Sequence, residues 1–165
     1  DEILNLLRDN IISSLQQTGR DGENKDGMDI SLITIDIKNR ILYYAGANNS
    51  IYIINNQSII EYVPDKMPIS IYRTINQPFT LQTVPIRRND RVYMFSDGFI
   101  DQFGGEQGKK LKSAGFKDIL LKIQQYDFDV QRDYLHAFLT EWQKDLDQVD
   151  DILVLGFDLD SGMEL

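Results

Sequence analysis

The sequence contains no cysteine and a single histidine among its 165 residues. The absence of cysteine excludes disulfide bonds, thiolate metal sites and cysteine nucleophiles, and it suits a reducing compartment, so we expect a cytoplasmic protein. The one histidine, His136, lies within a predicted helix and has no supporting motif for a Ser-His-Asp system. We therefore interpret His136 as a helix-surface or packing residue.

Long apolar runs and net positive charge are also lacking. No run approaches the roughly 18 residues that cross a bilayer, and the first residues lack the basic region of a signal peptide. The 17 Lys and Arg against 26 Asp and Glu give a net charge of −9, which repels nucleic-acid phosphates and anionic lipid headgroups. We expect no nucleic-acid partner and no membrane contact by this segment. The same charge disfavours an acidic protein partner, although a local basic patch would override the total.

Glycine-rich phosphate cradles are absent as well. Neither a GxxxxGK[ST] loop nor a GxGxxG turn occurs in the sequence. Gly104, Gly105 and Gly108 precede Lys109 and Lys110, but their spacing fits neither motif. We interpret this segment as a glycine loop.

The hydrophobic pattern predicts the first half of an α+β domain. A composition of 42% hydrophobic and 26% charged residues is ordinary for a folded protein, and 165 residues fit one domain. Apolar residues three and four apart predict a helix over 2–17, and the polar run at 18–27 predicts an exposed loop. Short β-type runs then predict an antiparallel meander, with strands at 30–36, 41–45, 50–54 and 58–62. The apolar character of the first strand predicts burial on both its faces.

The second half completes this α+β pattern. All four prolines lie between residues 64 and 85, which excludes a helix there and allows an edge strand at 79–84. The remaining elements are predicted from periodicity and capping signals, as a strand at 91–95, helices at 116–126 and 130–142, and a strand at 152–159 before a frayed tail. This order predicts a mainly antiparallel sheet with helices packed on it.

Carboxylates at strand ends are the remaining candidates for chemistry. Asp97 follows the strand at 91–95 after one residue, and Asp150 and Asp151 directly precede the last strand. Because adjacent strand residues point to opposite faces, only one of Asp150 and Asp151 can face a given site. Oxygen ligands without His or Cys are those that Mg²⁺ and Mn²⁺ prefer. Spacing alone favours the alternative, in which Asp-Gly forms a turn and Asp-Asp a solvated strand start.

Several segments resemble a known family. The sequence is similar to the SpoIIE-like bacterial serine phosphatases of the PPM (protein phosphatase 2C-like) superfamily, through SDGFIDQFGG at 96–105, QVDDILVLGF at 148–157, DGMDISLITID at 26–36, YAGANNSIYII at 44–54 and DKMPISIY at 65–72. The likeness covers nearly the whole chain in the family's order, and the Asp-Gly and Asp-Asp pairs are its specific parts. It implies an αββα sandwich of antiparallel sheets flanked by helices.

The resemblance also implies an activity and a site. It makes Asp97 and Asp150 metal-binding and catalytic residues, and it makes Asp151 a structural neighbour. In that family two Mn²⁺ or Mg²⁺ ions share a hydroxide that attacks phosphoserine phosphorus, so that aspartates suffice without His or Cys.

One motif of the family is missing. The family has an upstream acidic residue and an Asp-Gly-His-Gly motif that complete the two-metal site, and the sequence contains neither. We interpret DGMD at 26–29 as a loop and strand start rather than as the missing ligands. We therefore expect residues 1–165 to be one SpoIIE-like phosphatase domain that lacks its N-terminal strands and carries half of the metal site.

Two functions stay open at this point. The first is the C-terminal portion of a metal-dependent protein serine/threonine phosphatase, at the cytoplasmic effector end of a larger bacterial signalling protein. Its substrate would be a phosphorylated regulator of the STAS (anti-sigma-factor antagonist) type, and a homodimer is compatible with the family. The second is a catalytically incomplete PPM-fold module that binds protein partners.

Overall fold

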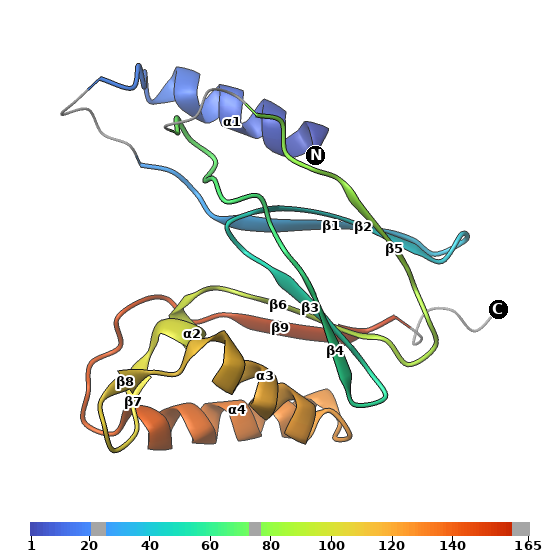
Figure 1. The fold of residues 1–165 in the computed structure, drawn as a ribbon, viewed down its shortest axis with the longest axis vertical. Coiled ribbons are helices and arrows are strands. Elements are labelled where there is room, and N and C mark those ends of the chain that lie inside the picture. The colour runs from blue at the N-terminus through green and yellow to red at the C-terminus, as the bar shows by residue number, and fades with distance from the viewer. Residues whose placement is uncertain (21–25, 73–76, 160–165) are drawn as a thin grey trace. The chain divides into compact units, whose positions relative to one another are not determined.

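The computed structural model describes residues 1–20, 26–72 and 77–159. The predicted loop at 18–27 falls partly outside these residues, and the predicted frayed tail lies wholly outside them. The chain divides into two compact units, one of residues 1–50 and 62–87 and the other of residues 51–61 and 88–165 (Figure 1). We call them the first and the second unit. No helix in the described parts of the chain is long and apolar enough to span a membrane.

The first unit combines one helix with a three-stranded sheet. Its elements are α1 (Glu2–Ser14), β1 (Ile30–Asp36), β2 (Ile41–Ala47) and β5 (Gln82–Pro85), and the strand order is β1-β2-β5 with antiparallel neighbours. A tight turn joins β1 to β2, because Asp36 accepts hydrogen bonds from the backbone and side-chain amides of Asn39. These two bonds lower the pKa of the Asp36 carboxyl.

Helix α1 is attached to the first unit by one buried apolar and one buried charged side chain. Leu4 is fully buried in a cluster that includes Ile69 and Phe79. One turn later, the buried Arg8 donates to the carbonyl oxygen of Gln77 at 2.8 Å, and its guanidinium lies 5.0 Å from the centre of the Phe79 ring. The helix therefore holds the segment before β5 by apolar, cation–π and hydrogen-bond contacts together.

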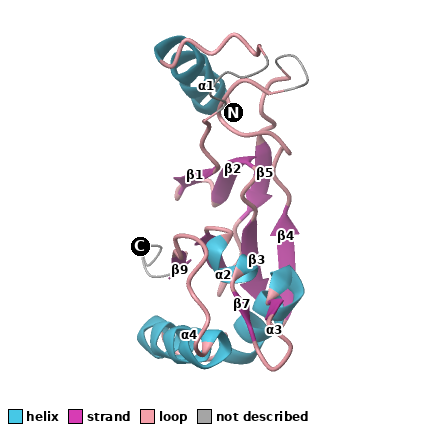
Figure 2. Ribbon diagram, turned by 90° about the vertical axis from the view of Figure 1, so that its left-hand side faces the viewer, coloured by secondary structure: helices cyan, strands magenta, loops and turns pink. Residues whose placement is uncertain are grey.

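The second unit has a four-stranded sheet, a small hairpin and three helices. Its strands are β3 (Ile51–Asn55), β4 (Ser58–Tyr62), β6 (Arg91–Phe95) and β9 (Val154–Asp158), and its other elements are α2 (Gly98–Asp101), β7 (Phe103–Gly104), β8 (Lys109–Lys110), α3 (Lys112–Ile123) and α4 (Phe128–Gln143). The strand order is β4-β3-β6-β9, and β6 pairs antiparallel with both of its neighbours. Figures 1 and 2 show α3 and α4 on the same face of this sheet.

An aromatic cluster forms the core between that sheet and α3. The ring of Phe116 lies 5.1 Å from that of Phe95 and 4.8 Å from that of Phe99, and the rings of Tyr52 and Phe95 are 4.6 Å apart. Helix α3 presents Phe116, Ile119, Leu120 and Ile123, all buried, at the spacing of one helical face. This packing fixes the end of β6 and the start of α2, where the conspicuous Asp-Gly pair lies.

Most predicted elements are confirmed. The strands at 30–36, 58–62 and 91–95 match β1, β4 and β6, and the antiparallel sheets with flanking helices of an α+β fold are present. Helix α1 ends at Ser14 rather than at residue 17, and Leu15 is exposed.

Two expectations are wrong, and two elements were missed. The four early strands do not form one meander, because β2 and β3 belong to different sheets. Strand β1 is not buried on both faces, since its residues are half-buried or exposed and it lies at the edge of its sheet. Helix α2 and the β7–β8 hairpin are too short for a periodic pattern to reveal.

We expect Leu4→Ala to destabilise the protein by about 2–5 kcal/mol, because it removes a fully buried side chain and leaves a cavity. Leu6→Ala, in the same helix at a position that is 64% exposed, should change the free energy of unfolding by no more than about 0.5 kcal/mol. Urea unfolding followed by circular dichroism measures both. Equal losses in the two variants would contradict the packing of α1 described here.

We also expect stability to fall as the pH rises from about 10 to about 12. Burial, and then the negative charge of Glu61, raise the pKa of Tyr52 to about 12. The unfolded chain therefore loses this proton near pH 10 while the folded chain keeps it, so the unfolded state gains stability in that window. Urea unfolding at intervals across it should show a loss that is smaller in Tyr52→Phe by up to about 2 kcal/mol. Identical pH profiles for the two proteins would contradict this assignment.

Candidate active site

The strand end that carries Asp97 is joined to the segment that carries Asp151 by one serine. The Ser96 N–H donates to the carbonyl oxygen of Leu153 at 3.0 Å. The Ser96 hydroxyl donates to the carbonyl oxygen of Asp151 at 2.7 Å and accepts the N–H of Leu153 at 2.9 Å. The ladder between β6 and β9 thus continues beyond both strands, through a side chain, into the two acidic segments.

Glycine at position 98 permits this approach. A Cβ at Gly98 would overlap the carbonyl oxygen of Asp151 and would lie 3.1 Å from the Ile152 side chain. Asp97 occupies the N-cap position of α2, and its carbonyl oxygen accepts the N–H of Asp101 at 2.9 Å. The Asp-Gly pair therefore ends a strand, starts a helix and lies against the Asp-Asp backbone.

The Asp-Asp pair has a local hydrogen-bond pattern of its own. One carboxylate oxygen of Asp150 accepts the N–H of Asp151 at 2.7 Å, and the Asp150 carbonyl oxygen accepts the side-chain amide of Gln148 at 2.7 Å. Asp97, Asp150 and Asp151 are all exposed. The structure thus brings together the two segments that the sequence singled out, while the metal-binding roles of Asp97 and Asp150 stay predictions.

Gln102 is a buried residue of this region that the sequence did not reveal. Its side chain is fully buried, donates to the carbonyl oxygen of Asp147 at 3.0 Å and accepts the N–H of Val149 at 3.4 Å. Its own carbonyl oxygen accepts the indole N–H of Trp142 at 3.1 Å. Gln102 therefore attaches the end of α2 to the loop that leads to Asp150. A lone glutamine after a helix carries no motif that would have identified it.

An apolar groove of the second unit lies away from these aspartates. A groove of about 650 Å³ runs between α4 and β9 and is lined mainly by apolar side chains, among them Leu135, Leu139 and Val154. The exposed His136 borders this groove, in agreement with a helix-surface histidine. None of the three aspartates lines it.

The donor chemistry of the aspartates fits Mg²⁺ or Mn²⁺. Carboxylate oxygens at an exposed edge are ligands that these hard cations accept while keeping several waters. Over residues 1–20, 26–72 and 77–159, no three His, Asp or Glu residues are arranged to hold a metal ion. The DGMD segment belongs to the first unit and leads directly into β1, as expected of a strand start. The described aspartates are thus suitable ligands for such a cation, but they are few in number.

Comparison with known proteins identifies the family. Residues 1–160 match the family described as Stage II sporulation protein E (SpoIIE). The SiaA-PP2C domain of Pseudomonas aeruginosa is 30% identical with a TM-score of 0.73, over 79% of this chain and 51% of that one. The phosphatase domain of the cell fate determinant SpoIIE from Bacillus subtilis is 12% identical with a TM-score of 0.57, over 95% of this chain and 71% of that one.

Two further facts concern the extent of this similarity. The chain spans about half the length of the SiaA-PP2C domain chain, and no curated protein gives a significant sequence match. A second SpoIIE structure, of the phosphatase domain with a fragment of the regulatory domain, has a TM-score of 0.64 at 13% identity, over 90% of this chain and 47% of that one, which supports the fold. The chain belongs to the SpoIIE family and has an α+β, PP2C-like fold.

Proposed function

We propose that this chain is part of a metal-dependent protein phosphatase that hydrolyses phosphoserine or phosphothreonine on a bacterial signalling regulator. The observation that carries the proposal is the double hydrogen bond of the Ser96 hydroxyl, which holds the Asp97 segment beside Asp151. An Asp-Gly turn and an Asp-Asp pair far apart in the sequence are thereby neighbours, as phosphatase chemistry that depends on aspartates requires.

The proposed roles of the residues follow from their surroundings. Asp97 and Asp150 are exposed and would hold divalent cations, two in the complete domain, whereas the Asp151 backbone is engaged by Ser96 and Gly98. Bound Mn²⁺ or Mg²⁺ would acidify a water and neutralise the charge of the phosphoryl oxygens. Ser96, Gly98 and Gln102 position the two segments and do not themselves contact the phosphate.

The proposed substrate is a phosphorylated protein. The aspartates lie at an exposed edge outside the apolar groove, so a phosphorylated side chain on a protein surface reaches them more readily than a small apolar ligand would. Family resemblance favours a regulator of the STAS type as the partner.

A catalytically incomplete interaction module is the second candidate. The absence of a three-ligand metal group within the described residues is the observation that favours it. Phosphatase activity that requires Asp97 separates the two candidates.

We expect Asp97→Asn and Asp150→Asn each to reduce Mn²⁺-dependent kcat/KM by about 100-fold or more, since each removes a charged ligand. The assay uses a phosphoserine peptide and the longest natural polypeptide that contains this chain. Circular dichroism should show unchanged folds, because both side chains are exposed.

Two further variants serve as controls for this experiment. Asp151→Asn and His136→Ala should each retain most of the activity, because the first keeps the backbone contacts of Asp151 and the second lies on the surface of α4. If Asp151→Asn were as damaging as Asp150→Asn, the two aspartates would have to exchange roles. Full activity in Asp97→Asn would overturn the assignment of Asp97 as a metal ligand, whereas no Mn²⁺-dependent activity in the unsubstituted polypeptide would leave only the interaction module.

We expect Gln102→Met to destabilise the protein by about 1–3 kcal/mol, because Asp147 and Val149 lose a buried partner. In the same natural polypeptide the Mn²⁺ concentration for half-maximal activity should rise about tenfold, since the loop before Asp150 is released. Gln107→Met, at an exposed position of the hairpin, is the matched control and should change neither quantity. A stability loss in Gln102→Met with an unchanged Mn²⁺ requirement would limit Gln102 to a structural role.

A further inference from the structure

The hairpin after α2 has a net positive charge, although the chain as a whole is acidic. Residues 102–112, which we call the lysine hairpin, contain Lys109, Lys110 and Lys112 and one acid, Glu106, so three positive charges minus one negative charge give +2. The chain as a whole carries −9. An anionic partner repelled by the rest of the surface is therefore attracted here.

The lysine hairpin is firmly anchored. Strand β7 pairs with β8, and the N–H of Gly105 donates to the carbonyl oxygen of Trp142, the last but one residue of α4, at 2.8 Å. The Trp142 indole in turn donates to Gln102. A Cβ at Gly104 would overlap the Trp142 carbonyl oxygen, so the hairpin backbone lies directly on the helix. Its lysines are thus presented from a fixed frame, which lowers the entropy cost of binding.

A hollow lies between these groups. It measures about 500 Å³ and is lined by the three lysines, by glycines 104 and 105, by Glu106 and Gln107, and by Trp142. The two glycines have no side chains to fill the hollow, so it is open to an extended peptide beside Trp142. Its lining carries three lysines against one glutamate. This shape distinguishes the hairpin from a flat, solvated lysine surface.

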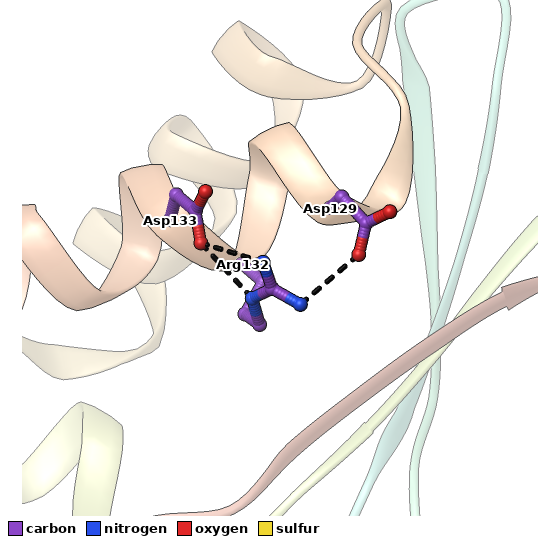
Figure 3. Close-up of polar contacts among 3 residues, drawn as sticks. All are labelled: Asp129, Arg132 and Asp133. Atoms are coloured by element: carbon purple, nitrogen blue, oxygen red, sulfur yellow. Dashed lines mark hydrogen bonds and ion pairs between the residues drawn. The ribbon is translucent and has the colours of Figure 1, made fainter.

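Two of the lysines keep their charge available. Lys110 is paired with Asp101 at 2.7 Å, and Arg132 on α4 is paired with Asp129 at 3.0 Å and with Asp133 at 2.9 Å (Figure 3). By contrast, Lys109 and Lys112 are exposed, and neither forms an ion pair with another residue in the described parts of the chain. Their positive charge is therefore available to a partner.

We propose that the lysine hairpin binds an acidic segment of a protein partner. A peptide can enter the hollow and meet Lys109 and Lys112 without approaching the acidic remainder of the surface, whereas a lipid surface or a nucleic acid is too extended to avoid it. Only four residues, the α2 helix, separate Asp97 from Gln102. On the proposed function, on which this identification of the partner rests, the acidic segment belongs to the phosphoprotein substrate.

Trp142 provides the measurement, because it is the only tryptophan of the chain and lines the hollow. Titration of this chain with a hexaglutamate peptide should give a saturable change in tryptophan fluorescence. The affinity should fall when NaCl rises from about 50 to about 500 mM, because salt screens exposed charges. No fluorescence change, or binding that is insensitive to salt, would overturn the proposal.

Charge reversal locates the binding. The double variant Lys109→Glu with Lys112→Glu should weaken peptide binding about tenfold or more. The double variant Lys38→Glu with Lys66→Glu makes the same change in net charge at two exposed positions of the first unit, and it should bind with nearly the original affinity. Equal weakening in both double variants would show a general charge effect and overturn the proposal.

Two further measurements separate other partners from a protein. Phosphatidylserine vesicles and inorganic phosphate should each bind more weakly than the peptide, and a stronger, lysine-dependent binding of either would overturn the assignment to protein. Peptide binding needs neither metal nor turnover, so a negative activity assay leaves it intact. If the lysine variant loses peptide binding but hydrolyses a short phosphopeptide as before, docking is supported. If the original chain binds no peptide, docking is refuted while the proposed phosphatase function is not.

Discussion

The hydroxyl of Ser96 is the point on which the arrangement of the acidic segments depends. Strands β6 and β9 are neighbours in the sheet through their own ladder, but that ladder ends at Phe95 and Val154. Beyond it, Ser96 both donates to and accepts from the opposing backbone. A side chain with one donor and free lone pairs can replace two ladder bonds at once, which alanine cannot do. The aspartates thus occupy a defined edge rather than two independent loops.

Local patterns in the sequence predicted the strands and helices whose formation depends on neighbouring residues. The β-branched and aromatic runs of β1, β4 and β6, and the apolar face of α3, are visible without tertiary contacts. The division of the strands between two sheets was not visible, because the short link between β2 and β3 looks like a hairpin turn. Helix α2 and the β7–β8 hairpin were not predicted for another reason, because elements this short show no hydrophobic periodicity.

The candidate site also contains some residues that the sequence predicted and one that it could not. The Asp-Gly and Asp-Asp pairs were found because their residue types suit a cation at strand ends, and family resemblance assigned their roles. Gln102 could not be found, because its importance comes from a carbonyl oxygen, a backbone N–H and an indole N–H that only the folded chain gathers around it. Buried amides of this kind are costly to leave unpaired, so the loop that supplies their partners is held in place.

The hydrogen bond within the Asp-Asp pair restrains the side chain of Asp150. One oxygen of the Asp150 carboxylate accepts the N–H of Asp151, and that oxygen keeps a second lone pair. A side chain held in one rotamer loses less conformational entropy on binding a ligand than a freely rotating one does. The backbone amide of Asp151 thereby pre-organises the carboxylate of its neighbour.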